Sequence, residues 1–391
     1  MKIPITKPLF GPEELRAVQL PLESGWVAQG PFVRRFEEKF SEFTDARFSI
    51  ATTSCTTALH VAVAAMGLKP GDEVVVPAFT WVSTPNVVEY MGARPVFCDV
   101  HLDTFNIDPN QMDALITPRT VGIMPVHLFG LCADMGPIQK IAKRNGLWIV
   151  EDAACAFGAW YGARHAGTFG EMGCFSFHPR KSITTGEGGM ITTAREDLDQ
   201  VARVLRDHGA SRSEREREEG QEAFLLAEYK HLGYNYRMTD IQGALGCAQM
   251  ERAKWILAER RRHVRSYDEM LAEVGWLQRP VVPEDYIHGY QAYVCLFKPE
   301  EPTLDTVAQL HERRNGLMAR LEARGIATRQ GTHAPVILGY YAEKYTLRPE
   351  QFPNAYIADR LSLTLPLYAQ MTGEEQEFVC RGLRDAFLAH T

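Results

Sequence analysis

Short apolar, β-branched runs alternate with longer amphipathic stretches between about residues 46 and 195. The runs have the length and composition of buried strands, and the stretches between them have the length and periodicity of helices. Helices that separate buried strands are typical of a mostly parallel sheet with helices on both faces. The pattern therefore predicts an α/β fold. The predicted strands are 73–79, 94–100, 121–126, 147–152, 174–178 and 189–194, and the predicted helices are 54–67, 83–92 and 134–146.

A long helix is predicted to connect this sheet to a second unit. Ile241, Leu245 and Ala248 recur at helical spacing, and basic residues follow them. We therefore expect a large domain over residues 1–250, which includes an N-terminal segment, and a small C-terminal α+β domain over residues 251–391. In the small domain, the predicted strands are 290–297, 326–329 and 363–367, and the predicted helices are 305–325 and 373–390.

The segment 211–223 is rich in charges of both signs and has no apolar periodicity. Such a segment is typical of a solvated loop or a frayed helix. A mobile flap near a site is the alternative interpretation.

The composition limits the class of protein. The chain has 391 residues, of which 45% are hydrophobic and 23% charged, as in an ordinary globular protein. Its formal net charge of -7 offers no basic field for a nucleic-acid backbone, so we expect a small-molecule substrate and no nucleic-acid partner. No apolar run has the length of a signal peptide or a membrane helix. We therefore expect a cytoplasmic protein with no membrane partner.

The eight cysteines are spread along the chain, with no CxxC pair and no Cys/His cluster at zinc spacing. We expect free thiols in a reducing compartment and no metal site.

Asp152 ends the predicted strand 147–152. Ligands of open parallel sheets bind beyond the carboxyl ends of the strands, so a polar residue in this position is a candidate for a site. The carboxylate can cap a following helix. It can also face a pyridine nitrogen and keep it protonated, which makes the ring an electron sink.

Lys181 lies between the strand 174–178 and a glycine-rich turn at 186–189. A lone lysine is usually a solvated surface charge. This lysine, however, follows a strand that looks buried and precedes a turn in which the backbone can approach a ligand closely. In a partly desolvated site a lysine loses its proton more readily and can add to an aldehyde.

Two further positions fit a flat, phosphorylated ligand. Ser54, Cys55 and Thr56 open a predicted helix, whose free N–H groups and dipole favour a phosphate, although Ser54 as a plain N-cap explains the segment equally well. Trp81 follows a predicted strand and can stack on an aromatic ring, with core packing as the alternative. A phosphate pocket, a stacking ring, a carboxylate and a lysine in one α/β domain are the parts of a pyridoxal phosphate site.

The chain resembles the DegT/DnrJ/EryC1/StrS family of sugar aminotransferases nearly from end to end. The segment around Lys181 is the most specific, because FSF, a lysine and TGEGG follow one another there. The resemblance implies the type I aspartate-aminotransferase fold and pyridoxal 5'-phosphate as the cofactor. The matching segments include SCTTALH, GDEVVVPAFTWVST, EDAACAFGAWYG, GCFSFHPRKSITTGEGGMITT and GYNYRMTDIQGAL.

The resemblance also implies roles for individual residues. Lys181 would hold the cofactor as a Schiff base, and Asp152 would pair with the pyridine nitrogen. Ser176 and the region of Thr56 would bind the phosphate, and Trp81 would cover the ring.

Asn235 matches a family residue that reaches the cofactor phosphate of the neighbouring subunit. The resemblance therefore implies a homodimer with shared active sites. An asparagine in a turn before the following helix is the alternative explanation of this residue.

Two positions depart from the commonest family pattern. Cys55 stands where glycine is usual, which restricts the backbone beside the phosphate. Cys155 replaces the Gln or His that usually lies near the phenolic oxygen of the cofactor, and a thiol is a weaker hydrogen-bond partner.

In the small domain, Arg329 and His333 are candidates for the substrate pocket, although His333 alone also fits a buried structural histidine.

The resemblance implies transamination in two halves. An amino acid, usually glutamate or glutamine, displaces Lys181 and leaves its nitrogen on the cofactor, and a nucleotide-linked keto sugar then takes the nitrogen. The expected acceptor is a 4-keto-6-deoxyhexose or a related 3-keto sugar, made for a surface polysaccharide or a glycosylated natural product. A cyclitol acceptor is the alternative.

Two other activities remain open. A pyridoxamine-phosphate dehydratase of the same family removes a sugar hydroxyl, but that branch commonly has histidine in place of the lysine. A cofactor-binding regulatory protein would need neither a reactive lysine nor an open pocket.

Overall fold

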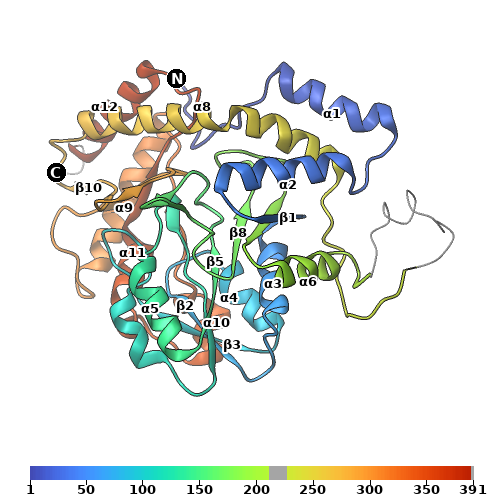
Figure 1. Cartoon of the computed structure of the whole chain (residues 1–391). Coiled ribbons are helices and arrows are strands. Elements are labelled where there is room, and N and C mark those ends of the chain that lie inside the picture. The colour runs from blue at the N-terminus through green and yellow to red at the C-terminus, as the bar shows by residue number, and fades with distance from the viewer. Residues whose placement is uncertain (211–226, 389–391) are drawn as a thin grey trace.

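The computed structural model describes residues 1–210 and 227–388 and shows a seven-stranded sheet between layers of helices (Figure 1). The predicted loop 211–223 lies outside the described residues. The strand order is β1-β9-β8-β5-β4-β2-β3. The bounds are β1 Phe48–Thr52, β2 Glu73–Pro77, β3 Arg94–Cys98, β4 Thr120–Ile123, β5 Trp148–Asp152, β8 Met172–Ser176 and β9 Gly189–Thr193.

The sheet is mostly parallel, as predicted. The strands β8, β5, β4, β2 and β3 all run in one direction. Only β9 is reversed within this sheet, and it pairs antiparallel with both β8 and β1. The carboxyl ends of the parallel strands therefore meet at one edge, where ligands of such sheets bind.

Helices cover both faces of the sheet. Val74 and Val76 of β2 pack in a core shared with α3, α4 and α6, whereas Val75 packs on the opposite face with α5. Farther along that second face, α2 and α8 cover β8 and β9. Because both faces are buried, the strands appear in the sequence as nearly continuous apolar runs. The flanking helices are α2 Pro31–Thr44, α3 Cys55–Ala65, α4 Ser83–Tyr90, α5 Met135–Asn145 and α6 Glu196–Arg206.

The predicted connecting helix is α8, Asp240–Met270. It runs along the top of Figure 1, from α1 and α2 to α12. Asp240 at its start accepts hydrogen bonds from the backbone N–H groups of Gly30 and Val33, and His263 near its end pairs with Gln376 of α12. The helix therefore joins the sheet to the C-terminal unit.

The C-terminal unit is a three-stranded antiparallel sheet, in the order β10-β12-β13, packed with helices. The proposed boundary at residue 250 falls inside α8, and one continuous core contains both Val150 of β5 and Leu363 of β13. The division into domains 1–250 and 251–391 therefore stays a proposal. The elements are β10 Leu277–Gln278, β12 Tyr293–Phe297, α9 Val307–Ala323, α10 Gly339–Tyr345, α11 Pro353–Leu361, β13 Ser362–Leu365 and α12 Gly373–Leu388.

The predicted strand 326–329 is wrong. Ile326 forms an isolated bridge with Ile3, and Arg329 forms another with Thr364. The segment changes partners between these two residues, so it pairs with no single neighbour for the length of a strand.

Several elements have no counterpart in the sequence-based prediction. A second three-stranded sheet, in the order β11-β6-β7, lies apart from the main sheet. The helix α1 contains Pro21 and leaves several large apolar side chains exposed, which weakens its amphipathic pattern. The bounds are α1 Pro12–Ser24, β6 Trp160–Tyr161, β7 Arg164–His165 and β11 Tyr286–Ile287.

The first residues of the chain pair with the C-terminal unit. The Ile3 N–H donates to the Gly325 carbonyl at 2.8 Å, and the Ala327 N–H donates to the Ile3 carbonyl at 3.0 Å. The Leu367 N–H donates to the Ile5 carbonyl at 3.1 Å. This N-terminal segment is therefore hydrogen-bonded to the C-terminal unit, although it belongs to the part of the chain that precedes the large sheet.

In the described part of the chain, no helix is long and apolar enough to cross a membrane. All eight cysteines are free thiols. Within residues 1–210 and 227–388, no group of three or more His, Cys, Asp or Glu side chains could hold a metal ion.

Candidate active site

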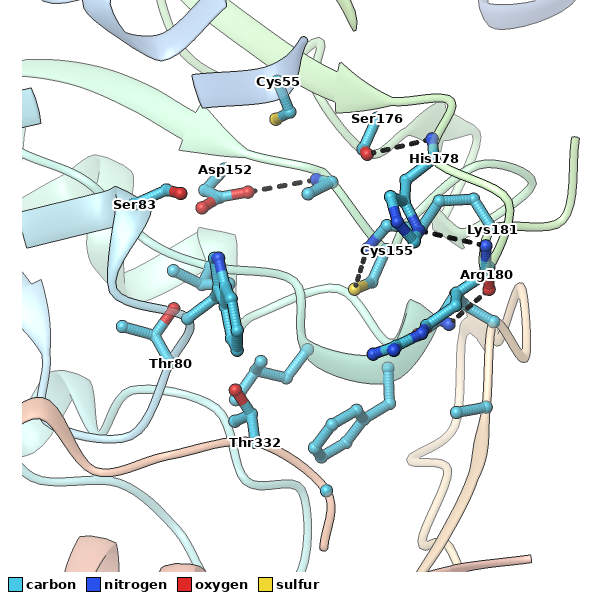
Figure 2. Close-up of a pocket in the computed structure, with 18 of the residues that line it drawn as sticks. Cys55, Thr80, Ser83, Asp152, Cys155, Ser176, His178, Arg180, Lys181 and Thr332 are labelled. Atoms are coloured by element: carbon cyan, nitrogen blue, oxygen red, sulfur yellow. Dashed lines mark hydrogen bonds between the residues drawn. The ribbon is translucent and has the colours of Figure 1, made fainter. Parts of the chain in front are cut away.

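The carboxyl ends of β2, β5 and β8 and the N-terminus of α3 meet at a cavity of about 670 Å³ (Figure 2). The C-terminal unit contributes residues 329–333 to the wall. Every residue that the sequence analysis selected, except Asn235, lines this cavity. These residues are Cys55, Thr56, Trp81, Asp152, Cys155, Ser176, Lys181, Arg329 and His333.

Asp152 is 4% exposed at the end of β5. Its carboxylate accepts hydrogen bonds from Thr84 Oγ1 at 2.7 Å and from the Ala154 N–H at 3.1 Å. Burial raises the pKa of the Asp152 carboxyl, whereas these two hydrogen bonds and the charge of Lys181 oppose the rise. No helix begins after Asp152, so the alternative role as a helix cap is wrong.

The residue before Asp152 fixes the end of β5. Glu151 points to the other face, where it accepts hydrogen bonds from His127 Nε2 at 2.8 Å and from the Gly167 N–H at 2.7 Å. The N–H groups of Phe169 and Gly170 donate to its other oxygen at 2.6 Å. A fully satisfied buried carboxylate of this kind holds the strand end in one position.

Lys181 lies in the loop after β8, and its Nζ donates a hydrogen bond to Cys155 Sγ at 3.0 Å (Figure 2). Burial lowers the pKa of the Lys181 amine, but Cys155, Cys55 and Asp152 raise it, and the net direction is upward. The net direction is therefore the opposite of the one that burial alone predicts. The hydrogen bond to Cys155 and the nearby Asp152 carboxylate favour the charged form of the amine.

The N-terminus of α3 is held against the cavity by close backbone packing. Ser54 is indeed the N-cap, because its side chain accepts a hydrogen bond from the Thr57 N–H. The backbone N–H groups of Cys55 and Thr56 lie in the first turn of α3. N–H groups in a first turn have no hydrogen-bond acceptor within the helix. A Cβ atom on Gly189 would lie 2.3 Å from the Ser54 carbonyl oxygen, so only glycine lets β9 pass this close.

Trp81 and His333 form the exposed rim of the cavity. Trp81 is 58% exposed, which rules out the core-packing alternative. Its ring lies 5.9 Å from the His333 ring, centroid to centroid. The side chain of His333 is 46% exposed, so it is not a buried structural histidine. The Thr80 N–H donates to the His333 carbonyl at 2.9 Å, which ties the two units together at the rim.

Two arginines carry positive charge on the cavity wall. Arg180 precedes Lys181, and Arg329 comes from the C-terminal unit. Burial and the charge of Arg180 lower the pKa of Arg329. Among the residues that the structure describes, neither guanidinium has an ion-pair partner. Two like charges without counterions form a site for an anion.

Asn235 lies outside the cavity. Its side chain is exposed, and its backbone forms an isolated antiparallel bridge with Asp207. The cavity of the same chain therefore does not use this residue.

The sequence analysis missed several residues that surround the cavity. Arg180 could have been found, because it stands directly beside Lys181. Thr84 gave no signal, because its contact with Asp152 depends on how α4 sits over the sheet. The other missed lining residues include Ile5, Thr6, Thr80, Ser83, His178, Glu187, Gln291 and Thr332.

Comparison with known sequences places this geometry among related proteins. A sequence model of the DegT/DnrJ/EryC1/StrS aminotransferase family matches residues 8–384. The chain is 35% identical over 389 residues to the spore coat polysaccharide biosynthesis protein SpsC of Bacillus subtilis, with 98% of this chain and 96% of the relative covered. It is 37% identical over 383 residues to the GDP-perosamine synthase of Caulobacter vibrioides, with 98% and 97% covered.

Solved structures show the same architecture. The PMP form of the putative sugar aminotransferase Spr1654 from Streptococcus pneumoniae superposes with a TM-score of 0.92 at 25% sequence identity. All of both chains is covered. The same protein has also been solved in a PLP form, with a TM-score of 0.91.

Proposed function

Because the chain belongs to the DegT/DnrJ/EryC1/StrS aminotransferase family and is a pyridoxal-phosphate-dependent sugar aminotransferase, we propose that it moves an amino group from glutamate to a nucleotide-linked keto sugar. The proposed acceptor is a 4-keto-6-deoxyhexose, used for a surface polysaccharide or a glycosylated natural product. The observation that carries the proposal is one cavity in which Lys181 and the buried Asp152 lie together with two arginines that have no ion-pair partner among residues 1–210 and 227–388.

The residues on the cavity wall fit the cofactor. The donor-rich first turn of α3 and the hydroxyls of Thr56 and Ser176 suit a phosphate, and the exposed face of Trp81 suits a flat ring. Asp152 is a buried acid of the kind that a protonated pyridine nitrogen needs as a partner. We propose that these side chains and Lys181 hold pyridoxal phosphate.

When bound, pyridoxal phosphate supplies an aldehyde that amines can join and a ring that withdraws electrons from the adjacent carbon. Once free of the cofactor, the Lys181 amine would accept a proton at Nζ from the substrate carbon and could return it in the reverse step. The hydrogen bonds from Thr84 and the Ala154 N–H favour the anionic form of Asp152 against the effect of burial, and in that form it would pair with a protonated pyridine nitrogen. Cys155 holds the free Lys181 amine in place.

Arg180 and Arg329 are the proposed site for the anionic part of the acceptor. The chain as a whole is negatively charged, with a net charge of -7, so a diphosphate gains little attraction from the rest of the surface. Guanidinium groups bind phosphate oxygens in pairs of hydrogen bonds, and these two approach the cavity from different units. The C-terminal unit would thus bring one half of the diphosphate site.

A homodimer is proposed from two features of the surface. The side chain of Asn235 is exposed, and the backbone bridge with Asp207 fixes its position. Both properties are expected of a residue that contacts a second copy of the chain. Near α1, Phe10, Leu15 and Leu22 are 53%, 68% and 58% exposed, which is costly in a monomer. We propose that a second copy covers this face and that each Asn235 completes the cavity of its partner.

A cofactor titration followed by a substrate screen tests the function. Purified protein is mixed with pyridoxal phosphate and its visible absorption is recorded, and glutamate is then added to convert the cofactor to its amino form. Nucleotide-linked keto sugars, and keto cyclitols as the comparison class, are added one at a time to see which restores the original band. The proposal fails if no keto sugar restores the band, or if Lys181→Ala still turns over.

Mixing two inactive variants tests the shared site. If Asn235 acts on the partner's cavity, a mixture of Lys181→Ala and Asn235→Ala chains forms hybrid dimers that each contain one intact site, and activity returns. If Asn235 acts within its own chain, the mixture stays as inactive as its components. Light scattering of the same samples reports whether the chain is dimeric.

A further inference from the structure

The segment 329–334 of the C-terminal unit, which we call the strap, contributes all but its last residue to the cavity wall. No helix or longer strand includes this segment, so other groups must hold it in place. The Arg329 N–H donates to the Thr364 carbonyl at 3.3 Å, and the Thr80 N–H donates to the His333 carbonyl at 2.9 Å. The strap is therefore tied down near both ends, and it carries one of the two arginines proposed for the acceptor.

A single buried carboxylate holds the middle of the strap. Asp359 is 4% exposed and lies near the end of α11. Its Oδ1 accepts hydrogen bonds from the Ala334 N–H at 2.9 Å and from Gln330 Nε2 at 3.0 Å. The same oxygen lies 3.9 Å from His333 Nδ1. Gln330 Nε2 also donates to the Thr332 carbonyl at 2.7 Å, so Asp359 fixes both the backbone and a side chain of the strap.

Ser362, three residues after Asp359, holds the strap at one more point. Its Oγ accepts a hydrogen bond from the Gly331 N–H at 3.0 Å. A Cβ atom on Gly331 would lie 2.8 Å from Phe129 Cζ, so the strap packs closely on the ring of Phe129, which lines the cavity. Of the described residues that line the cavity, none is Asp359 or Ser362. These two side chains therefore act on the cavity only through the strap.

The charge of Asp359 depends on the groups around it. Burial raises the pKa of the Asp359 carboxyl, whereas the hydrogen bond from Ala334 and the charges of Arg360, His333 and Arg314 oppose the rise. A buried carboxylate favours one arrangement of its donors, because any donor that moves away leaves the charge poorly solvated. The strap is therefore held in one conformation.

From these contacts, we propose that Asp359 is a positioning residue that holds the strap in the conformation in which Arg329 meets the acceptor. The proposal rests on the proposed function for the identity of that acceptor. Asp152 and Lys181 come from the ends of β5 and β8, so the strap does not set their positions. We therefore expect loss of Asp359 to impair the step with the keto sugar and to spare the step with glutamate.

The first measurement follows the strap itself, in the full-length chain loaded with pyridoxal phosphate. Hydrogen exchange read by mass spectrometry on peptides that cover residues 329–338 reports how often the strap opens. Asp359→Ala should speed exchange in these peptides about tenfold, the effect of one lost hydrogen bond to a charged group. Asp359→Asn keeps an acceptor oxygen and should stay near the wild type.

The second measurement separates the two half-reactions by their absorbance changes. In Asp359→Ala the rate constant for the keto sugar should fall about tenfold, whereas that for glutamate should stay within about twofold of the wild type. Gln330→Met removes only the side-chain contact, so it serves if Asp359→Ala folds poorly, and the sugar step should then fall about threefold. Asp385→Ala is the control, because Asp385 pairs with Arg324 on the surface, and both steps should match the wild type.

The two proposals fail in different ways. A wild-type chain that aminates no keto sugar would refute the proposed function, and the exchange experiment would still decide whether Asp359 positions the strap. Unchanged exchange in Asp359→Ala would overturn the positioning proposal alone. Equal losses in the glutamate and sugar steps, in an active enzyme, would overturn it as well.

Discussion

Thr84 donates a 2.7 Å hydrogen bond to Asp152, a residue 68 positions away along the chain. The threonine belongs to the first turn of α4, and its hydroxyl also lies 3.1 Å from the Thr80 hydroxyl. Both threonines are fully buried. Asp152 is therefore connected through the hydroxyl of Thr84 to the hydroxyl of Thr80, which follows β2 in the sequence.

Replacing Thr84 by valine removes this hydrogen bond and keeps the shape of the side chain. The pKa of Asp152 should rise further, because Thr84 is one of the groups that oppose the effect of burial. The acid limb of the pH–rate profile should then move to higher pH, and kcat/KM should fall about tenfold, which corresponds to about 1.4 kcal/mol. Thr84→Ser keeps the donor and serves as the control. An unshifted acid limb in Thr84→Val would show that the hydroxyl does not act on Asp152.

Gly189→Ala should disturb the N-terminus of α3. The new Cβ atom would lie 2.3 Å from the Ser54 carbonyl, so the backbone must move, at a cost of about 1–3 kcal/mol in the free energy of unfolding. The dissociation constant for pyridoxal phosphate should rise as well, because the same movement displaces the proposed phosphate site. Urea unfolding and cofactor titration check both effects. Gly373→Ala is the matched control, because nothing lies within 4 Å of its added Cβ atom, and equal losses in the two variants would contradict the argument.

The arginine pair gives a prediction about substrate binding. Arg180→Gln and Arg329→Gln should each raise KM for the sugar nucleotide about tenfold and weaken its dependence on salt, because a charge contact is lost. Steady-state kinetics at two salt concentrations measure this, with Arg16→Gln as the control because Arg16 already pairs with Glu13 on the surface. If KM for glutamate rises and KM for the sugar does not, the pair binds the donor instead.

His165 should make the fold sensitive to acid. Burial lowers the pKa of His165 to about 4, so the folded protein holds the ring neutral while the unfolded chain takes up a proton near the ordinary value. Stability from this residue is fully present above the unfolded pKa and is lost as the pH falls toward the folded pKa. Between pH 7 and pH 5 the loss should be about 2 kcal/mol.

Chemical denaturation of the wild type and of His165→Gln at the two pH values measures this loss. The variant should lose about 2 kcal/mol less over the interval. Because burial also lowers the pKa of His288, to about 3, some acid sensitivity should remain in the variant. An identical pH dependence in the two proteins would show that His165 is not the sensitive group.

The sheet and its ligand edge could be predicted from the sequence for a physical reason. Strands buried on both faces must be apolar throughout, so β2 and β5 stand out, and the polar residue at the end of β5 marks the edge where ligands bind. Lys181 could be located in the same way, from the strand before it and the glycines after it.

Other features depend on contacts that no local pattern encodes. The segment 326–329 looks like a strand by composition, but its partners change from Ile3 to Thr364. The pKa of Lys181 was expected to fall on burial, and the sulfur of Cys155 reverses the direction because it lies within hydrogen-bond distance. Both depend on positions far apart in the sequence.

The pairing of the first residues with the last part of the chain sets an order of events during synthesis. Ile3 and Ile5 are made more than three hundred residues before their partners Gly325, Ala327 and Leu367. Until those partners emerge, the strand-like N-terminus has no place to pair, and the part of the cavity wall that contains Ile5 is missing. A nascent chain therefore cannot carry a finished active site until Leu367 has been made and has emerged to pair with Ile5.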